Sequence, residues 1–437
     1  MTITTIATLS LFINFSILIF LFLKNPFRPS QFFILVSIFS FCIRPIATSS
    51  CDFFRPFYFF NPAMYFSGVV FANIGLTLFS SALLFTTRQS NSTQNVDPLE
   101  FNRFSNYIVI LLVITDVFAL VVFGQAILPG FRDSGLQATA QGSQVVFAVV
   151  NLLTVLGVAS SLFCYISPRV NAPVLKAALR LLIIFLLSML FYQRGPFISG
   201  VLLGLFICSI DDRNFIYRNY KKVILALTIV LIVAVLGRPL ILLIFELIAG
   251  SAGLQNSFTF VSQESLHCGI ANSPNQEHDQ VWPILITYVD TFGPDYYYNL
   301  LSSIFRPFLN SEDRDRWGLF TSVDALNTYN DAKTYLDKNF GFSLSAFNYH
   351  YFALGPLFLA VTPILGVTTG FVENSVKSPR INLVSFGKIF LKYNLLITMF
   401  GAVDEQIKWL ILNSVGFYIL KGSFRSVRIL TVMSGRS

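Results

Sequence analysis

The chain is short of charged residues, of histidine and of paired cysteines. Asp, Glu, Lys and Arg make up 12% of its 437 residues, whereas soluble globular proteins typically contain about 25%, so a soluble globular fold is excluded. The five cysteines, Cys42, Cys51, Cys164, Cys208 and Cys268, form no CxxC pair, so neither a disulfide framework nor a zinc site is expected. All three histidines lie between residues 250 and 350, which confines histidine chemistry to that interval.

Hydrophobic residues, by contrast, make up 54% of the chain and recur in windows long enough to cross a bilayer. About 30 Å of hydrocarbon requires roughly 20 apolar residues. We predict about eleven spans, over residues 3–23, 32–49, 65–87, 107–128, 143–166, 177–193, 196–210, 223–249, 351–373, 385–402 and 405–421. The first window has no basic residue before it and no small-residue cleavage site after it, so it is expected to remain as a helix. The predicted fold class is an all-α, polytopic integral membrane protein.

Basic residues indicate how these spans are oriented. Lys and Arg follow the first, seventh and ninth windows, precede or open the sixth, and form the carboxyl-terminal tail. With eleven spans all five groups fall on one side, which the positive-inside rule identifies as cytoplasmic. The amino terminus is then expected outside and the carboxyl terminus inside.

The interval 250–350 is the one long polar stretch. It carries eleven Asp or Glu against five Lys or Arg, a net charge of −6, so the remainder of the +8 chain carries +14. This asymmetry follows membrane sidedness, whereas a nucleic-acid binder concentrates basic charge on one folded face, so no nucleic acid is expected as a partner. We predict spans one to eight in 1–249, a large external loop at 250–350 with short helices over 295–308 and 323–336, and spans nine to eleven with a basic tail in 351–437.

Two arginines stand near the outer mouth of the predicted bundle. Arg194 lies in an outer turn before Gly195-Pro196, and Arg238 lies in the outer half of the eighth window beside a proline. Charge inside a span costs about 2.5–3.5 kcal/mol on insertion scales, so such residues face protein or water. A planar guanidinium grips phosphate oxygens bidentately and stays charged. Arg194 and Arg238 are therefore candidates for a diphosphate clamp; the alternative is that each pairs with a membrane acid such as Asp116.

The long loop contains groups that can move protons. Transfer from a diphosphate to a hydroxyl needs a base near the acceptor and cations near the leaving group. The loop acids and histidines are candidate bases, with His350, Asp290 and Asp324 selected as catalytic candidates, and Arg306 is a further candidate cation. The run Glu277-His278-Asp279 is not expected to bind a metal, because adjacent residues rarely converge on one ion.

Three segments match local features of one family of membrane proteins. Gln193-Arg194-Gly195-Pro196-Phe197 looks like the Arg-Gly turn that opens one of their transmembrane helices. The segment 299–307, which ends at Arg306-Pro307, is similar to an apolar helix of their outer loop. The stretch from Asn339 through Gly341, Ser343 and Ser345 to Gly355-Pro356 resembles their approach to the span after the loop. Many relatives have a glutamate two residues before the tyrosine of this stretch, where this chain has Tyr349.

Together these segments resemble the bacterial oligosaccharide repeat-unit polymerases, the Wzy-type O-antigen and capsule polymerases. This resemblance implies a function, an architecture and a location. The chain would be a membrane glycosyltransferase of GT-C-like architecture that joins undecaprenyl-diphosphate-linked oligosaccharides at the periplasmic face of the bacterial inner membrane. It would be inverting and independent of metal, cofactor and nucleotide sugar. Arg194 and Arg238, or Arg306, would hold the diphosphate, and His350 or a loop aspartate would act as base. Independently of the resemblance, Tyr296, Tyr297 and Tyr351 are candidates to contact the glycan, and anchoring at the membrane interface is the alternative for the tyrosine run. A chain-length regulator and a flippase of the same pathway are the expected partners, besides the lipid bilayer.

Three other functions remain open on the sequence. A lipid-glycan ligase has the same architecture but delivers finished chains to another acceptor. A flippase or exporter would carry the same substrate, although exporters generally lack an external domain of this size and no internal repeat of the transporter kind is evident. A non-catalytic scaffold would use the loop to bind partners.

Overall fold

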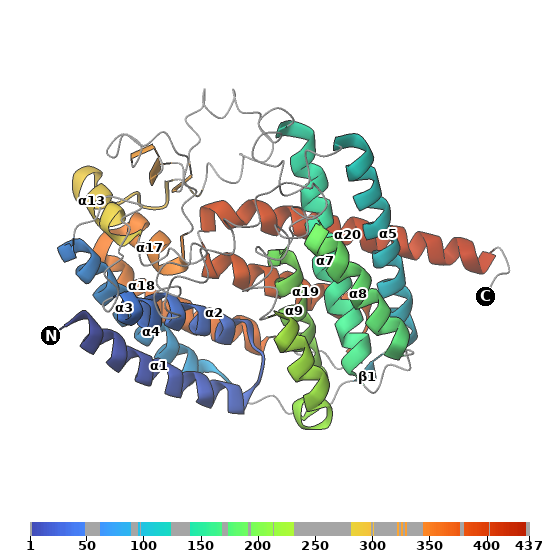
Figure 1. Cartoon of the computed structure of the whole chain (residues 1–437), viewed down its shortest axis with the longest axis horizontal. Coiled ribbons are helices and arrows are strands. Elements are labelled where there is room, and N and C mark those ends of the chain that lie inside the picture. The colour runs from blue at the N-terminus through green and yellow to red at the C-terminus, as the bar shows by residue number, and fades with distance from the viewer. Residues whose placement is uncertain are drawn as a thin grey trace, which may run out of the picture. The chain divides into compact units, whose positions relative to one another are not determined.

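The computed structural model describes residues 2–48, 62–88, 95–96, 98–123, 140–167, 174–190, 194–212, 214–230, 281–298, 300, 321–322, 325–326, 328–329, 344–375, 380–401 and 403–433. Almost all of these residues are helical (Figure 1). The helices are Ile3–Lys24 (α1), Pro29–Ile38 (α2), Arg44–Thr48 (α3), Pro62–Thr86 (α4), Pro98–Phe123 (α5), Ala140–Ile166 (α7), Val174–Leu190 (α8), Arg194–Asp211 (α9), Trp282–Phe292 (α13), Ala346–Leu354 (α17), Phe358–Asn374 (α18), Leu383–Phe400 (α19) and Val403–Met433 (α20). A π-helical turn, Phe39–Ile43 (η1), a 3₁₀ turn, Gly355–Leu357 (η4), and a parallel pair of two-residue strands, Asn95–Val96 (β1) and Arg380–Ile381 (β2), are also present, and residues 215–230 are helical.

Seven described segments are long and apolar enough to cross a membrane. They are Ile3–Lys24, Pro29–Ala47, Ala63–Thr86, Glu100–Phe123, Val146–Ile166, Ala346–Asn374 and Leu383–Phe400. The prediction of a helical protein with many membrane-length helices is therefore confirmed. The count of eleven stays a prediction, and most of the predicted eighth window lies outside the described residues.

Two helices extend well beyond their predicted windows. α5 begins at Pro98 rather than near residue 107, and the Glu100 carboxylate in its first turn accepts a hydrogen bond from the Leu383 backbone N–H at 3.2 Å. α20 continues to Met433, past Lys421 and Arg425. Lys, Arg and Glu are good helix formers, so a helix continues through polar residues where hydropathy marks the end of the apolar window.

The predicted loop helices agree with the structure in part. Residues 325, 326, 328 and 329, within the predicted helix 323–336, are helical. The predicted helix 295–308 begins too early, because 296 and 297 form a turn; most of its remainder lies outside the described residues. α13 was not predicted, because its apolar run of only eleven residues stands inside a polar interval.

The chain divides into two compact units, and neither is one contiguous stretch. Unit 1 comprises residues 1–89, 261–375 and 394–410, and unit 2 comprises residues 90–260, 376–393 and 411–437. α19 and α20 each contribute a segment to both units.

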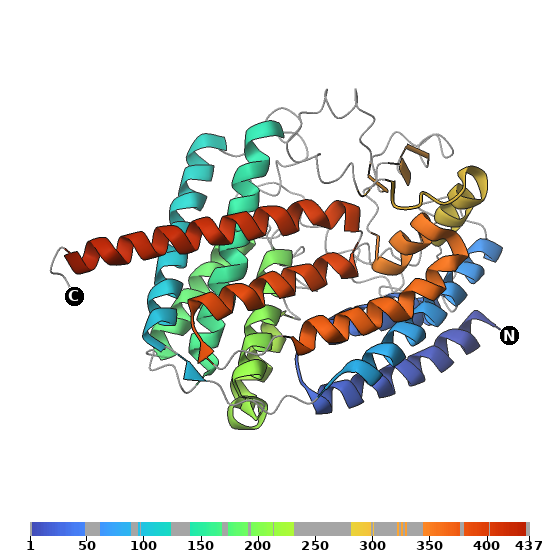
Figure 2. The ribbon, with the colours of Figure 1, turned by 180° about the vertical axis from the view of Figure 1, so that it is seen from behind.

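Unit 1 is built around α4, which packs against α1, α13 and α18. Figure 2 shows α18 (orange) running alongside α4 (blue). Gly366 of α18 permits this approach: a Cβ there would lie 2.5 Å from the Phe79 carbonyl oxygen and 3.0 Å from the Ala82 Cβ. Small residues at such positions let membrane helices pack backbone against backbone.

One end of unit 1 is closed by a buried polar network. The Arg28 guanidinium donates to the Glu373 carbonyl oxygen at 3.0 Å, and the Glu373 carboxylate accepts from the Ser30 N–H at 2.9 Å. The Asn374 amide donates to the Thr86 carbonyl oxygen at 2.8 Å. These bonds bring the end of α4, the end of α18 and the start of α2 together. The basic segments that follow the first and ninth predicted spans therefore begin at the same end of unit 1.

Unit 2 is built around α7, which packs against α5, α8 and α9 (Figure 1). The hydroxyls of Ser105 on α5 and Ser161 on α7 lie 2.8 Å apart, and the Arg180 guanidinium of α8 donates to the Asn102 side-chain oxygen at 2.9 Å. At the same end, Lys222 donates to the Tyr165 carbonyl oxygen at 2.7 Å. Basic residues thus gather at one end of unit 2.

Candidate functional site

The site forms where α17 meets a tight turn in unit 1. Ser345 caps the start of α17: its hydroxyl accepts from the Asn348 N–H at 3.3 Å, and the Asn348 side-chain oxygen accepts from the Ser345 N–H at 3.2 Å. This reciprocal arrangement satisfies donors that a helix start otherwise leaves without partners. The helix ends at Gly355, whose φ of 57° favours glycine. The segment predicted to lead into the ninth span is therefore a short, capped helix.

The turn after α13 fits over the end of α17. The N–H groups of Asp295 and Tyr296 donate to the carbonyl oxygens of Phe352 at 3.1 Å and Ala353 at 2.8 Å. The last carbonyls of a helix lack partners within it, so the turn caps α17. Tyr296 and Tyr297 both have positive φ, 50° and 62°. Such backbone costs about 1–3 kcal/mol per residue and persists only where the surroundings impose it.

This strained turn places Tyr297 against His350. The Tyr297 hydroxyl oxygen and His350 Nδ1 lie 2.8 Å apart, and the rings meet edge to face with centroids 5.8 Å apart. His350 is 5% exposed, and its Nε2 has no hydrogen-bond partner among the described residues. Burial raises the pKa of Tyr297 to about 12, so the phenol is neutral at physiological pH and can either donate to or accept from the imidazole.

Tyr349 completes the polar cluster, which we define as Tyr297, Tyr349 and His350. Its ring centroid lies 5.5 Å from that of His350 and 5.9 Å from that of Tyr297. Its buried hydroxyl has no hydrogen-bond partner within the described part of the chain. The sequence singled out position 349 only as a departure from the resembling family, so this hydroxyl was missed. Two neighbouring side chains of α17 thus each present a buried polar atom that lacks a described partner.

A carboxylate from the start of α20 supports the other side of α17. Asp404 Oδ2 accepts from the Ser322 N–H at 2.6 Å, and Oδ1 accepts from the Ser322 hydroxyl at 3.0 Å. Ser345 also forms an isolated antiparallel bridge with Gly401. The residues around 322 and 345 are therefore tied to the α19–α20 junction within unit 1.

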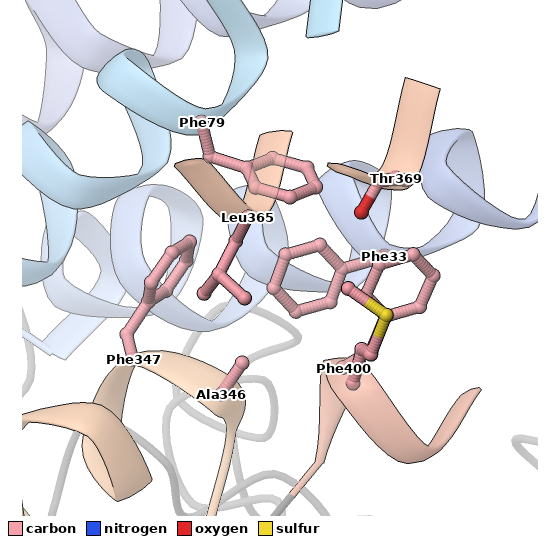
Figure 3. A pocket seen from close by; sticks show the side chains of 8 residues that line it. Phe33, Phe79, Ala346, Phe347, Leu365, Thr369 and Phe400 are labelled. Carbon is pink, nitrogen blue, oxygen red and sulfur yellow. The ribbon is translucent and has the colours of Figure 1, made fainter. Parts of the chain in front are cut away.

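The floor below α17 is aromatic and dry. Figure 3 shows Phe33, Phe79, Phe347 and Phe400 around a hollow too narrow for a water molecule. Phe33 stacks on Phe400 with centroids 4.6 Å apart and meets Phe79 edge to face at 5.1 Å. Phe347, three residues before His350, anchors α17 in this aromatic layer.

The other candidate site residues that the structure describes do not belong to the polar cluster. Asp290 is exposed on α13, and Tyr296 is 71% exposed. Tyr351 is 2% exposed, and its ring packs edge to face on Trp282 at 5.1 Å, in the core. The structure thus brings together His350 and Tyr297 of the predicted residues, and it places Tyr351 within the packing of unit 1.

The structure describes almost nothing of the predicted phosphate-binding residues. Arg194 is the first residue of α9, in unit 2, but its side chain is outside the described part of the structure. Arg238, Arg306 and Asp324 also lie outside the described residues. No three His, Cys, Asp or Glu side chains gather at one place within the described ranges.

Comparison with known proteins returns no match among protein-family models, curated proteins or solved structures. The described helices nonetheless define the class: this is a multi-pass α-helical membrane protein, by the length and composition of its helices. Within unit 1 the buried His350 and the half-buried Tyr297 form a hydrogen-bonded pair close to the start of the long α17–α18 segment.

Proposed function

We propose that this protein is a membrane glycosyltransferase of the repeat-unit polymerase type. It joins undecaprenyl-diphosphate-linked oligosaccharides into O-antigen or capsular polysaccharide at the periplasmic face of the bacterial inner membrane. The observation that supports this proposal most is His350, buried, held at Nδ1 by Tyr297 and carrying an Nε2 that has no described partner. In a protein of this class such a histidine is suited to act as a base for a hydroxyl acceptor.

The chemistry follows from the tautomer of His350. With the proton on Nδ1, the ring donates to the Tyr297 oxygen and Nε2 presents its lone pair. Nε2 then removes the proton of the acceptor hydroxyl as its oxygen bonds to the anomeric carbon of the donor sugar. The bond from that carbon to the diphosphate breaks, and the lipid diphosphate leaves with the electron pair. Attack from the face opposite the leaving group inverts the anomeric configuration.

The location of the cluster agrees with this role. α18 has 17 residues, which corresponds to a length of about 25 Å, and it separates His350 from the Arg28–Glu373 network. Basic segments favour the cytoplasm, so the end with Arg28 is assigned to that side. The Tyr297–His350 end then faces the periplasm, where flipped lipid-linked units arrive.

Binding of the substrate needs more than the described cluster. In the proposal, Arg194, Arg238 and Arg306 neutralise the diphosphate, and Tyr296 stacks on a sugar ring. Asp290 and Asp324 remain alternative bases from the loop. The proposal also retains eleven spans, a GT-C-like architecture, and a chain-length regulator and flippase as pathway partners.

A deletion strain tests the function directly. Loss of a polymerase leaves single repeats on lipopolysaccharide, whereas loss of a ligase accumulates undecaprenyl-linked chains, and loss of an exporter leaves the units inside the cell. We expect single repeats, with long polymer restored by the wild-type gene and not by His350→Ala present in the membrane at equal amount. Long polymer from the His350→Ala variant would contradict the role of His350.

A further inference from the structure

A second buried polar site lies in unit 2, within a predicted membrane span. Asp116 of α5 is 2% exposed, and neither of its carboxyl oxygens has a hydrogen-bond partner among the described residues. It lies seven residues before the end of α5 at Phe123, which is about 10 Å along the helix axis. The carboxyl group is therefore inside the apolar segment rather than at its edge.

The packing of α5 shows which helices face Asp116. The Ile108 and Ile184 side chains both flank Gly157, at 3.4 and 3.2 Å from where its Cβ would stand. Asp116 is two helical turns further along the same buried stripe of α5. Ala119, one turn beyond, belongs to an apolar cluster with Val146 of α7 and Leu187 of α8. The Asp116 side chain thus belongs to the interface that α5 forms with α7 and α8.

On α8, the buried polar residue near the level of Asp116 is Ser188. It is 2% exposed, and its hydroxyl has no described hydrogen-bond partner. It lies one turn beyond Ile184 on the buried face of α8, and α5 and α8 run in the same direction. Leu187, the residue before Ser188, packs against Ala119, one turn beyond Asp116, which places Ser188 near the Asp116 carboxyl along the interface.

No described cation neutralises Asp116. α7 contains no acidic or basic residue. The two basic residues of α8, Lys176 and Arg180, precede Ser188 by eight residues or more, about 12 Å or more along the helix. Arg180 is already bonded to Asn102 at 2.9 Å. On α5 itself, Glu100 and Arg103 stand near the opposite end of the helix.

An unneutralised carboxylate in this interface would be costly. Moving an ionised group out of water costs several kcal/mol of free energy unless a partner compensates its charge. Carboxylate and hydroxyl oxygens are ligands suited to hard cations. We propose that Asp116 and Ser188 form a membrane-embedded binding site for a small monovalent cation, H⁺ or Na⁺. The site belongs to unit 2 and stands whether or not His350 acts as a base.

Carbodiimide labelling of the purified full-length protein tests this site. Dicyclohexylcarbodiimide reacts with protonated carboxyls in apolar surroundings, and mass spectrometry locates the adduct. We expect Asp116 to be labelled, with labelling falling about tenfold per pH unit above its midpoint. Asp212, paired with Arg218 at 3.0 Å, is the control and is expected to stay unlabelled. Protection by NaCl but not by KCl would identify Na⁺ as a ligand; equal labelling in both salts would identify H⁺.

Infrared difference spectra give an independent measurement. The wild type should show the carbonyl band of a protonated carboxylic acid, or a Na⁺-dependent carboxylate band, that Asp116→Asn lacks. The absence of both labelling and either band from about pH 5 to about pH 9 would overturn the proposal. Labelling that arises only in Arg194→Ala or Arg238→Ala would likewise overturn it, because Asp116 would then be held ionised by an arginine.

Discussion

At the scale of single residues, Tyr297 contacts His350. In the proposed mechanism it acts through His350 and not directly on the substrate. The chain adopts two consecutive positive φ values to bring this phenol to Nδ1. A hydrogen bond at one imidazole nitrogen sets the tautomer and hence the role of the other. In the proposed mechanism Tyr297 is therefore a positioning residue, and its neighbour Tyr296, which has the same unusual backbone but is 71% exposed, is a natural comparison.

Tyr297→Phe removes this hydrogen bond and keeps the ring. We expect polymer synthesis to fall by about fivefold to thirtyfold, the equivalent of a buried hydrogen bond worth about 1–2 kcal/mol. The pH dependence of the remaining activity should shift, because His350 loses its neighbour at Nδ1. Initial rates with a lipid-linked donor across pH measure both effects.

Tyr296→Phe is the matched control and should leave the pH profile in place. If Tyr297→Phe lowers the amount of folded protein but the activity per folded molecule and its pH profile match the wild type, Tyr297 has only a structural role.

At the scale of helices, close approach and backbone hydrogen bonding decide stability. α18 approaches α4 at Gly366, where a side chain has no room, whereas Gly422 of α20 has no atom within 4 Å of its would-be Cβ. Both glycines lie within helices, so the same substitution at the two positions separates packing from helix propensity.

Gly366→Ala should destabilise the protein by about 1–3 kcal/mol through overpacking. Gly422→Ala should be neutral or stabilising by up to about 1 kcal/mol, because alanine favours the helix. Thermal unfolding of both variants in one detergent compares them. Equal Tm values would show that α18 can shift away from α4 without cost.

The π-helical turn η1 presents a second case. Pro45 lacks a backbone N–H, and the helix before it widens over Phe39–Ile43. The Asn73 amide from α4 donates to the Phe41 carbonyl oxygen at 2.9 Å and to the Val69 carbonyl oxygen at 2.8 Å. A side chain of one helix thus supplies a donor to the irregular turn of another.

Asn73→Leu should therefore cost about 1–3 kcal/mol of unfolding free energy. Pro45→Ala restores a backbone donor to the turn, so the cost of Asn73→Leu should shrink in that background. A double-mutant cycle from thermal or denaturant unfolding measures the coupling, which we expect to be about 0.5–3 kcal/mol. Strict additivity of the two changes would mean that the proline and the amide do not act on the same turn.

At the scale of the whole molecule, each unit combines distant parts of the chain. In unit 1 the Arg28–Glu373 network and the Tyr297–His350 pair stand at opposite ends of α18. The two ends should therefore be exposed on opposite sides of the membrane. Thr291 and Ser375 are exposed residues near the respective ends and report on this directly.

In a variant whose five native cysteines are replaced by serine or alanine, Thr291→Cys should react with a membrane-impermeant maleimide added to spheroplasts. Ser375→Cys should react only after the membrane is opened. Labelling is read on a gel after purification, with the cysteine-free protein as the background. The reverse pattern would invert the proposed orientation, and would place His350 on the cytoplasmic side.

The sequence predicted most of the long apolar helices that the structure describes, but not α13, and it singled out His350 as a candidate base, which stays a prediction. It did not reveal that Tyr297, 53 residues earlier, is the partner of His350, because that contact depends on a left-handed turn capping α17. It proposed Tyr351 as a glycan contact; in the structure the Tyr351 side chain is 2% exposed and packs on Trp282, and the glycan contact stays a prediction.

The sequence by itself determined that this chain is a helical membrane protein. Apolar windows of roughly 20 residues can satisfy their backbone groups in hydrocarbon only as helices or closed barrels, and that requirement is local. Only the tertiary structure decided which polar side chains meet, in the His350–Tyr297 pair and the Arg28–Glu373 network, and which one, Asp116, is buried without a described hydrogen-bond partner. Those encounters depend on helix packing between residues far apart in the chain, which no window of the sequence contains.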